Sequence, residues 1–91
     1  MIKLSGRLIC QNLDEAQIVQ RFLPEHTSLT RNESGCIAFD VAVTADPLVW
    51  SVEELFTDEN TFTAHQERIK TSQWGTETRF ILREYEITEI V

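Results

Sequence analysis

The chain is poor in the residues that build several common kinds of site. Its three glycines, at positions 6, 35 and 75, lie too far apart to form a glycine-rich phosphate loop. Its two cysteines, Cys10 and Cys36, form no CxxC pair, which argues against a dithiol redox motif or a zinc cluster. No Gly-x-Ser-x-Gly elbow is present either. We therefore expect no metal site.

Long apolar runs and clusters of positive charge are also missing. The longest apolar runs fall far short of the roughly 20 residues that cross a bilayer, and no basic-then-apolar leader is present. With 15 acidic and 8 basic residues, the net charge is −7. This charge disfavours nucleic acid and anionic membranes as partners. We therefore expect a cytoplasmic protein that binds neither of them.

The hydrophobic pattern predicts one small domain over residues 1–91. Strand periodicity covers residues 2–10, 36–44, 48–57 and 79–89, and helical stripes follow Asn12 and Asp58. The resulting order is strand, helix, strand, strand, helix, strand. It predicts an α+β fold, a ferredoxin-like βαββαβ sandwich in which a four-stranded antiparallel sheet carries two helices on one face.

Three local features refine this prediction. Pro24 lies inside the first helical stripe, which runs from Ala16 to Leu29, and predicts a bend or two shorter helices. Gly35 is available for a positive-φ turn after that helix. The segment Trp74-Gly75-Thr76 predicts a loop leading from the second helix into the last strand.

The second face of the predicted sheet has no helix to cover it. The apolar residues assigned to this face are Ala38, Ala42, Val49, Leu55, Ile81, Tyr85 and Ile87. An uncovered apolar face on a small domain predicts a partner. The simplest partner is a second copy, so we expect a homodimer through the open sheet face.

A carboxylate and an imidazole stand where apolar residues are expected. Glu54 shares a strand face, and His65 a helical stripe, with mostly apolar residues, which are Trp50, Val52, Phe56, Phe62 and Ile69. Ionisable groups on two apolar faces indicate a lined pocket. The structural alternative is a histidine bonded to a carboxylate inside the core.

His65 is the best candidate for a general acid or base, because an imidazole titrates near neutral pH. Glu54 could orient it or keep it charged. Four aromatic residues could wall a pocket for a flat ring, with core packing as the alternative: Trp50, Phe56, Phe62 and Trp74. A metal site formed by His26 and His65 is possible but not favoured.

Charged residues nearby have simpler expected roles. Arg83 could neutralise an oxyanion or pair with Glu53 or Glu54, and the salt bridge is favoured. Glu33 and Arg31, at the end of the first helix, are expected to be solvated or capping groups.

Three short motifs, in this order, resemble those of the antibiotic biosynthesis monooxygenase family. Residues 33–36, Glu-Ser-Gly-Cys, are similar to its E-x-G-C junction, and residues 54–58 to its E-x-aromatic-x-D strand end. Phe56 stands where tryptophan is commoner in the family. Phe62 and His65 resemble its second-helix signature. The likeness runs from Ile2 to about Ile87 and includes the quinol monooxygenase branch.

The resemblance implies a dimeric α+β barrel with a hydrophobic cavity in each subunit. Characterised relatives oxidise phenols or hydroquinones to quinones with O₂, and they need neither metal nor flavin. By resemblance, His65 and Glu54 belong to the catalytic site, Trp74 lies at the same site, and no cofactor is expected. The residue pattern itself assigns substrate binding to Trp50, Phe56, Phe62, Trp74 and Arg83.

Two alternatives stay open. One is a non-catalytic dimer that binds a small ligand in the same fold. The other is a haem-degrading relative, in which a helix histidine binds iron and an asparagine lies near the first strand. Asn12 lies at the wrong end of its strand for that role.

Overall fold

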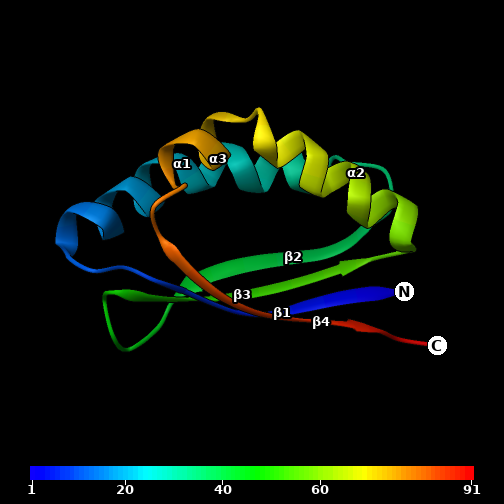
Figure 1. The fold of residues 1–91 in the computed structure, drawn as a ribbon, viewed down its shortest axis with the longest axis horizontal. Coiled ribbons are helices and arrows are strands. Elements are labelled where there is room, and N and C mark those ends of the chain that lie inside the picture. The colour runs from blue at the N-terminus through cyan, green and yellow to red at the C-terminus, as the bar shows by residue number, and fades with distance from the viewer.

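The computed structural model describes residues 1–91 as a sheet covered on one face by helices (Figure 1). The elements are β1 (Ile2–Ile9), α1 (Leu13–Arg31), β2 (Cys36–Val43), β3 (Val49–Phe56), α2 (Glu59–Lys70), α3 (Gln73–Glu77) and β4 (Leu82–Glu89). The four strands pair in the order β2-β3-β1-β4, and every pair is antiparallel. The predicted ferredoxin-like α+β fold is confirmed.

Both long helices begin at residues that can cap them. The side chain of Asn12 accepts a hydrogen bond from the backbone N–H of Glu15, and that of Asp58 accepts one from Thr61. Such caps satisfy backbone donors that have no partner within the helix. Gly35 then turns the chain from α1 into β2 with φ of 84°, the positive-φ turn expected from the sequence.

The course of α1 corrects two expectations. The helix runs unbroken through Pro24, so the division into two helices is wrong. Pro24 and Gln20 both lie on exposed turns, where water can reach the carbonyl group that the proline leaves without a donor. The buried stripe ends at Thr30, while Leu29 is exposed.

The return from α2 to β4 contains a short helix instead of the predicted loop. Helix α3 begins after Ser72, whose hydroxyl accepts a hydrogen bond from the N–H of Gly75. A Cβ atom at Gly75 would lie 2.0 Å from the carbonyl oxygen of Ile69, so only glycine allows α3 to pack this closely on the end of α2. This packing buries Trp74 beneath the helical layer.

The register of β4 corrects part of the predicted open face. Tyr85 and Ile87 lie opposite Gly6 and Leu4, and residues opposite each other in antiparallel strands point to the same face. Leu4 is a core residue, so both side chains are on the helix side of the sheet. Ile81 is buried before the strand begins. The assignment of these three residues to the open face is therefore wrong.

Candidate functional site

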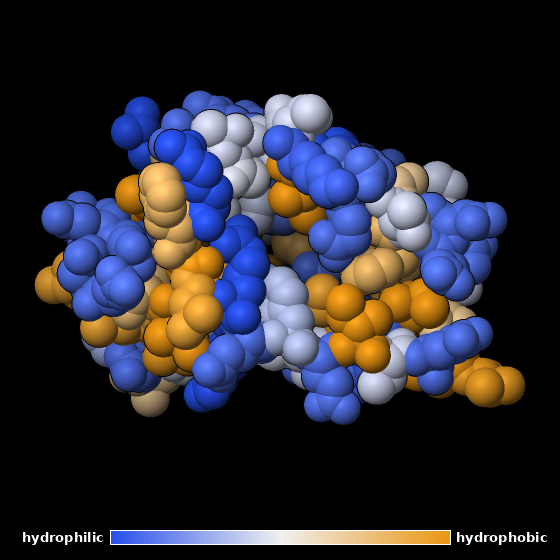
Figure 2. All heavy atoms as spheres, viewed as in Figure 1, coloured by the Kyte–Doolittle hydropathy of each residue, from blue (hydrophilic) through white to orange (hydrophobic).

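A cavity of about 230 Å³ lies between the helices and the sheet. The space-filling view shows a recess at this level, below the helical layer (Figure 2). The lining residues are Leu8, His26, Phe39, Val41, Val52, Glu54, Gln66, Ile69, Trp74, Arg83 and Tyr85. Most of the wall is apolar, and its few polar groups come from both layers.

Glu54 brings a carboxylate to the wall of this cavity. It lies on β3 opposite Leu4 of β1 and Phe39 of β2, so the sheet surrounds it on both sides. Only 7% of its side chain is exposed. Its Oε1 atom lies 3.5 Å from Nε2 of His65, in a geometry that makes no hydrogen bond.

His65 lies behind Glu54 and does not line the cavity. Its side chain has no exposed surface, and its ring packs on that of Phe56 with centroids 4.9 Å apart. Nδ1 is 2.7 Å from Oε1 of Glu33. The imidazole therefore stands between two carboxylates, one at the cavity and one on its far side.

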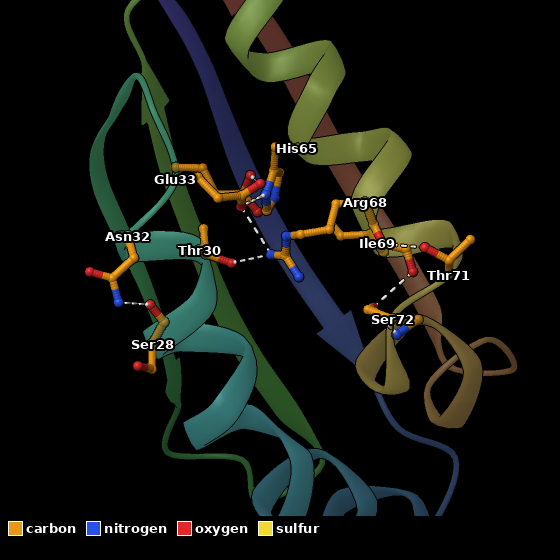
Figure 3. A network of polar contacts seen from close by, with 11 residues as sticks. Ser28, Thr30, Asn32, Glu33, His65, Arg68, Ile69, Thr71 and Ser72 are labelled. Carbon is orange, nitrogen blue, oxygen red and sulfur yellow. Dashed lines mark hydrogen bonds and ion pairs between the residues drawn. The ribbon is translucent and has the colours of Figure 1, made fainter.

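Glu33 continues this arrangement toward the surface. It accepts a hydrogen bond of 2.9 Å from Arg68, which also donates to the hydroxyl of Thr30. His65 and Arg68 project from α2 toward Glu33 at the end of α1 (Figure 3). With 18% of its side chain exposed, Glu33 is not the solvated group expected from the sequence, and that expectation is wrong.

The charged groups of this network, which joins Glu54, His65, Glu33 and Arg68, stabilise one another. Burial disfavours the imidazolium form of His65, but the carboxylates of Glu54 and Glu33 outweigh burial and raise the pKa of His65 above its ordinary value. Burial also acts against the charge on Glu33. Its hydrogen bonds with Arg68 and His65 prevail and lower its pKa. The two carboxylates therefore favour the charged form of His65.

His26 contributes a second imidazole, which does line the cavity. Its ring stacks on the indole of Trp74, with centroids 4.6 Å apart and planes 3° from parallel. Burial, together with the positive charges of His65 and Arg68, lowers the pKa of His26 to about 3, so this ring is neutral. The two imidazoles are 6.0 Å apart, and no group of three or more histidine, cysteine, aspartate or glutamate side chains is placed to hold a metal ion.

The sequence profile described as antibiotic biosynthesis monooxygenase matches residues 10–74, which is more than half of the chain. The chain belongs to the antibiotic biosynthesis monooxygenase (ABM) family. No curated protein matches the sequence.

Solved structures share the fold. SnoaB, a cofactor-independent oxygenase from Streptomyces nogalater, is similar at a TM-score of 0.80 and 10% identity, over 99% of this chain and 92% of its own. A Nitrosomonas europaea protein named after the ABM family gives a TM-score of 0.78 at 16% identity, over 100% of this chain and 99% of its own. At these identities the likeness concerns the fold, and the roles of individual residues depend on the geometry.

The aromatic residues predicted for the wall of this ABM-family cavity divide into three groups. Trp74 lines the cavity. Phe56 and Phe62 pack against each other behind His65, with centroids 5.7 Å apart, and form core instead of wall. Trp50 lies four residues before Glu54, about 13 Å along an extended strand, and lines a separate groove beside Pro47.

Arg83 lies in the cavity wall but forms no salt bridge with Glu53 or Glu54, so that favoured expectation is wrong. Its guanidinium donates hydrogen bonds to the carbonyl oxygens of Thr78 and Ile81 and to the Thr78 hydroxyl. Sequence reasoning gave no ligand role to Phe39 or Tyr85, which also line the cavity. Glu33 could have been noticed, because it begins the E-x-G-C motif.

His65 and Asn12 do not fit the roles that the haem-degrading alternative within the ABM family gives them. Iron would need a free imidazole nitrogen, yet His65 is enclosed with both nitrogens facing carboxylates. The side chain of Asn12 accepts the 3.0 Å capping hydrogen bond of α1. Neither residue is therefore available to an iron porphyrin.

Proposed function

We propose that this protein is a cofactor-independent monooxygenase that oxidises a small phenol or hydroquinone with O₂ in the cavity. The observation that carries the proposal is Glu54, a nearly buried carboxylate that lines a mostly apolar cavity with an imidazole behind it. Membership of the ABM family and the fold shared with a cofactor-independent oxygenase support the same reaction class.

In the proposed reaction, Glu54 accepts the proton of a phenolic hydroxyl group. The phenolate is electron-rich and transfers electrons to O₂, after which a C–O bond forms at a ring carbon that carries hydrogen. Loss of water from the resulting peroxide gives the quinone. For a hydroquinone, one substrate and one O₂ give one hydroxyquinone and one water, so no external reductant is needed.

His65 acts in this mechanism through Glu54, since it does not reach the cavity. Its charged ring holds the carboxylate in place. Because the charged ring carries a proton on each nitrogen, with Nδ1 bonded to Glu33 2.7 Å away, His65 cannot take up the phenolic proton. Glu54 instead returns that proton to the peroxide, from which it leaves as water.

Oxygen uptake with a panel of hydroquinones and anthrone-like phenols tests the proposal. Wild-type protein should consume one O₂ per quinone formed. Glu54→Gln keeps the shape but cannot accept the proton, so its turnover should fall roughly 10²–10⁴-fold. Equal turnover by Glu54→Gln would exclude this carboxylate as the base, and no uptake across the panel would contradict the oxygenase proposal.

A non-catalytic ligand-binding protein is the second candidate. The complete enclosure of His65 favours it, because an enclosed, charge-paired histidine also serves as core structure. Under this alternative, phenols bind in the cavity without oxygen uptake.

We further propose that the protein is a homodimer packed through the open sheet face. The helices cover only the other face (Figure 1). Four apolar side chains on neighbouring strands support this arrangement: Ile9, Val49, Leu55 and Leu82. No helix is long and apolar enough to cross a membrane. The cytoplasmic location stays a prediction.

A further inference from the structure

His26 is a buried polar residue that the proposed reaction leaves without a role. It projects from α1 into the layer between helices and sheet, and only 3% of its surface is exposed. Its Nδ1 atom is enclosed and has no hydrogen-bond partner. A buried polar atom without a partner is costly and is uncommon in folded proteins. Some other interaction is needed to explain why an imidazole stands here.

The position of the ring indicates which nitrogen can act. Because the ring lines the cavity while Nδ1 is enclosed, Nε2 is the nitrogen left for a molecule in the cavity. An enclosed N–H without an acceptor is worse than an enclosed lone pair, so the neutral ring carries its proton on Nε2. Stacking on Trp74 fixes the plane of the ring. His26 therefore presents an oriented hydrogen-bond donor to the cavity.

Glu54 supplies the opposite kind of group from the opposite layer. It is an acceptor on the sheet, whereas His26 is a donor on a helix, and both line the same cavity. A ligand that satisfies both needs a hydroxyl group for Glu54 and a second oxygen with a lone pair for His26. An aromatic ring with two oxygen substituents meets this requirement.

We propose that His26 is a second ligand-binding residue, whose Nε2–H donates a hydrogen bond to the second oxygen of an aromatic ligand held by its hydroxyl group at Glu54. This inference rests on the proposed function for the position of that hydroxyl group. It adds a specificity rule, namely that two oxygens on the ring are preferred to one.

Two pairs of matched probes test the rule without any turnover. The para pair is 4-methoxyphenol and 4-ethylphenol, and the meta pair is 3-methoxyphenol and 3-ethylphenol. Within each pair the shapes are nearly equal, and only the ether oxygen differs. Dissociation constants can be measured from the NMR shift of the Trp74 indole N–H. In at least one pair, wild-type protein should bind the methoxy probe about fivefold more tightly, the usual effect of one hydrogen bond.

His26→Phe is the decisive variant, because phenylalanine keeps the stack on Trp74 and removes both nitrogens. The preference for the methoxy probe should disappear, while ethylphenol binding should stay nearly the same. Equal binding of both probes to the wild type, a preference that survives in His26→Phe, or no binding at all would overturn the inference. If the preference behaves as expected but hydroquinones cause no oxygen uptake, the proposed function fails and the role of His26 stands.

The unaltered protein offers an independent check. Nitrogen-15 NMR should show His26 as the neutral tautomer protonated at Nε2 between pH 5 and 8. His26→Phe should melt at the same temperature as the wild type or higher, because it removes an unpaired buried nitrogen. A proton on Nδ1, or a large fall in melting temperature, would mean that the ring is bonded within the protein and would overturn the inference.

Discussion

The imidazole of His65 connects α2 with the end of α1 and with β3. It comes from α2, and it faces Glu33 at the end of α1 and Glu54 on β3. Its ring is completely buried, so it belongs to the core of the protein as well as to the site. Removing one member of a buried charged set leaves the others without compensation, which is strongly destabilising.

His65→Ala should therefore lower the free energy of unfolding by about 3 kcal/mol. Urea denaturation at pH 7 measures the change. Glu67→Ala, on the exposed side of the same helix, is the matched control, since its ion pair with Lys70 lies in solvent and should contribute little. A loss no larger than that of Glu67→Ala would show that the carboxylates do not depend on His65.

The lowered pKa of His26 makes the stability of the folded protein fall as the pH is lowered. Its pKa is about 3 in the folded protein against an ordinary value of 6.5, so below pH 6.5 the unfolded chain binds a proton that the folded chain does not. The stability that His26 contributes is therefore present above pH 6.5 and is lost as the pH falls toward 3. His65 does not disturb the range between pH 6 and 4.5, because its raised pKa leaves it charged in both states there.

Between pH 6 and 4.5, His26 should add up to about 1.4 kcal/mol per pH unit to the stability that the wild type loses, beyond the loss that carboxylates such as Glu33 cause in both proteins. His26→Phe should lack this added loss over the same range. Urea denaturation at pH 6.0, 5.2 and 4.5 gives the comparison. Parallel curves for the two proteins would mean that His26 takes up a proton in the folded state.

At the scale of elements, α3 sets one wall of the cavity. It holds Trp74 against His26, and it can do so because Gly75 lets it approach the end of α2. Gly75→Ala should force these helices apart and cost roughly 1–3 kcal/mol, as overpacking usually does. Thr76→Ala, one residue later and exposed, is the control. A shifted Trp74 indole signal in Gly75→Ala alone checks the prediction, and identical spectra for both variants would contradict it.

The elements were more predictable than their contacts. Alternation along the chain shows which residues share a strand face, so Glu54 and Phe56 were correctly placed on one face. It does not show how far a helix extends over that face. Trp50 shares the face of Glu54, yet it lies against another part of α1, beside Ala16 and Gln20. Sequence patterns also do not reveal which charges are enclosed, and Glu33 became a buried partner only through the packing of α2 on the end of α1.

At the scale of the whole molecule, the two faces of the sheet differ in how far the helices cover them. The helix face holds the buried core residues of β1 and β3, whereas the other face presents apolar side chains between polar pairs such as Ser5 with Glu53. A small chain that leaves such a face uncovered gains stability by pairing with a copy of itself. A stable dimer of this kind should bury more than about 1,000 Å² in total.

A substitution at Leu55 tests directly whether the open sheet face forms the dimer interface. It lies on the open face of the inner strand β3, opposite Lys3 on β1 and Ala38 on β2. Arginine at this position would face solvent in a single chain but would place an unpaired charge inside a dimer interface. Sedimentation equilibrium should therefore show a dimer for the wild type and a monomer for Leu55→Arg. Leu13→Arg, on the exposed surface of α1, should remain dimeric, and a monomeric wild type or a dimeric Leu55→Arg would mean that the sheet face is not the interface.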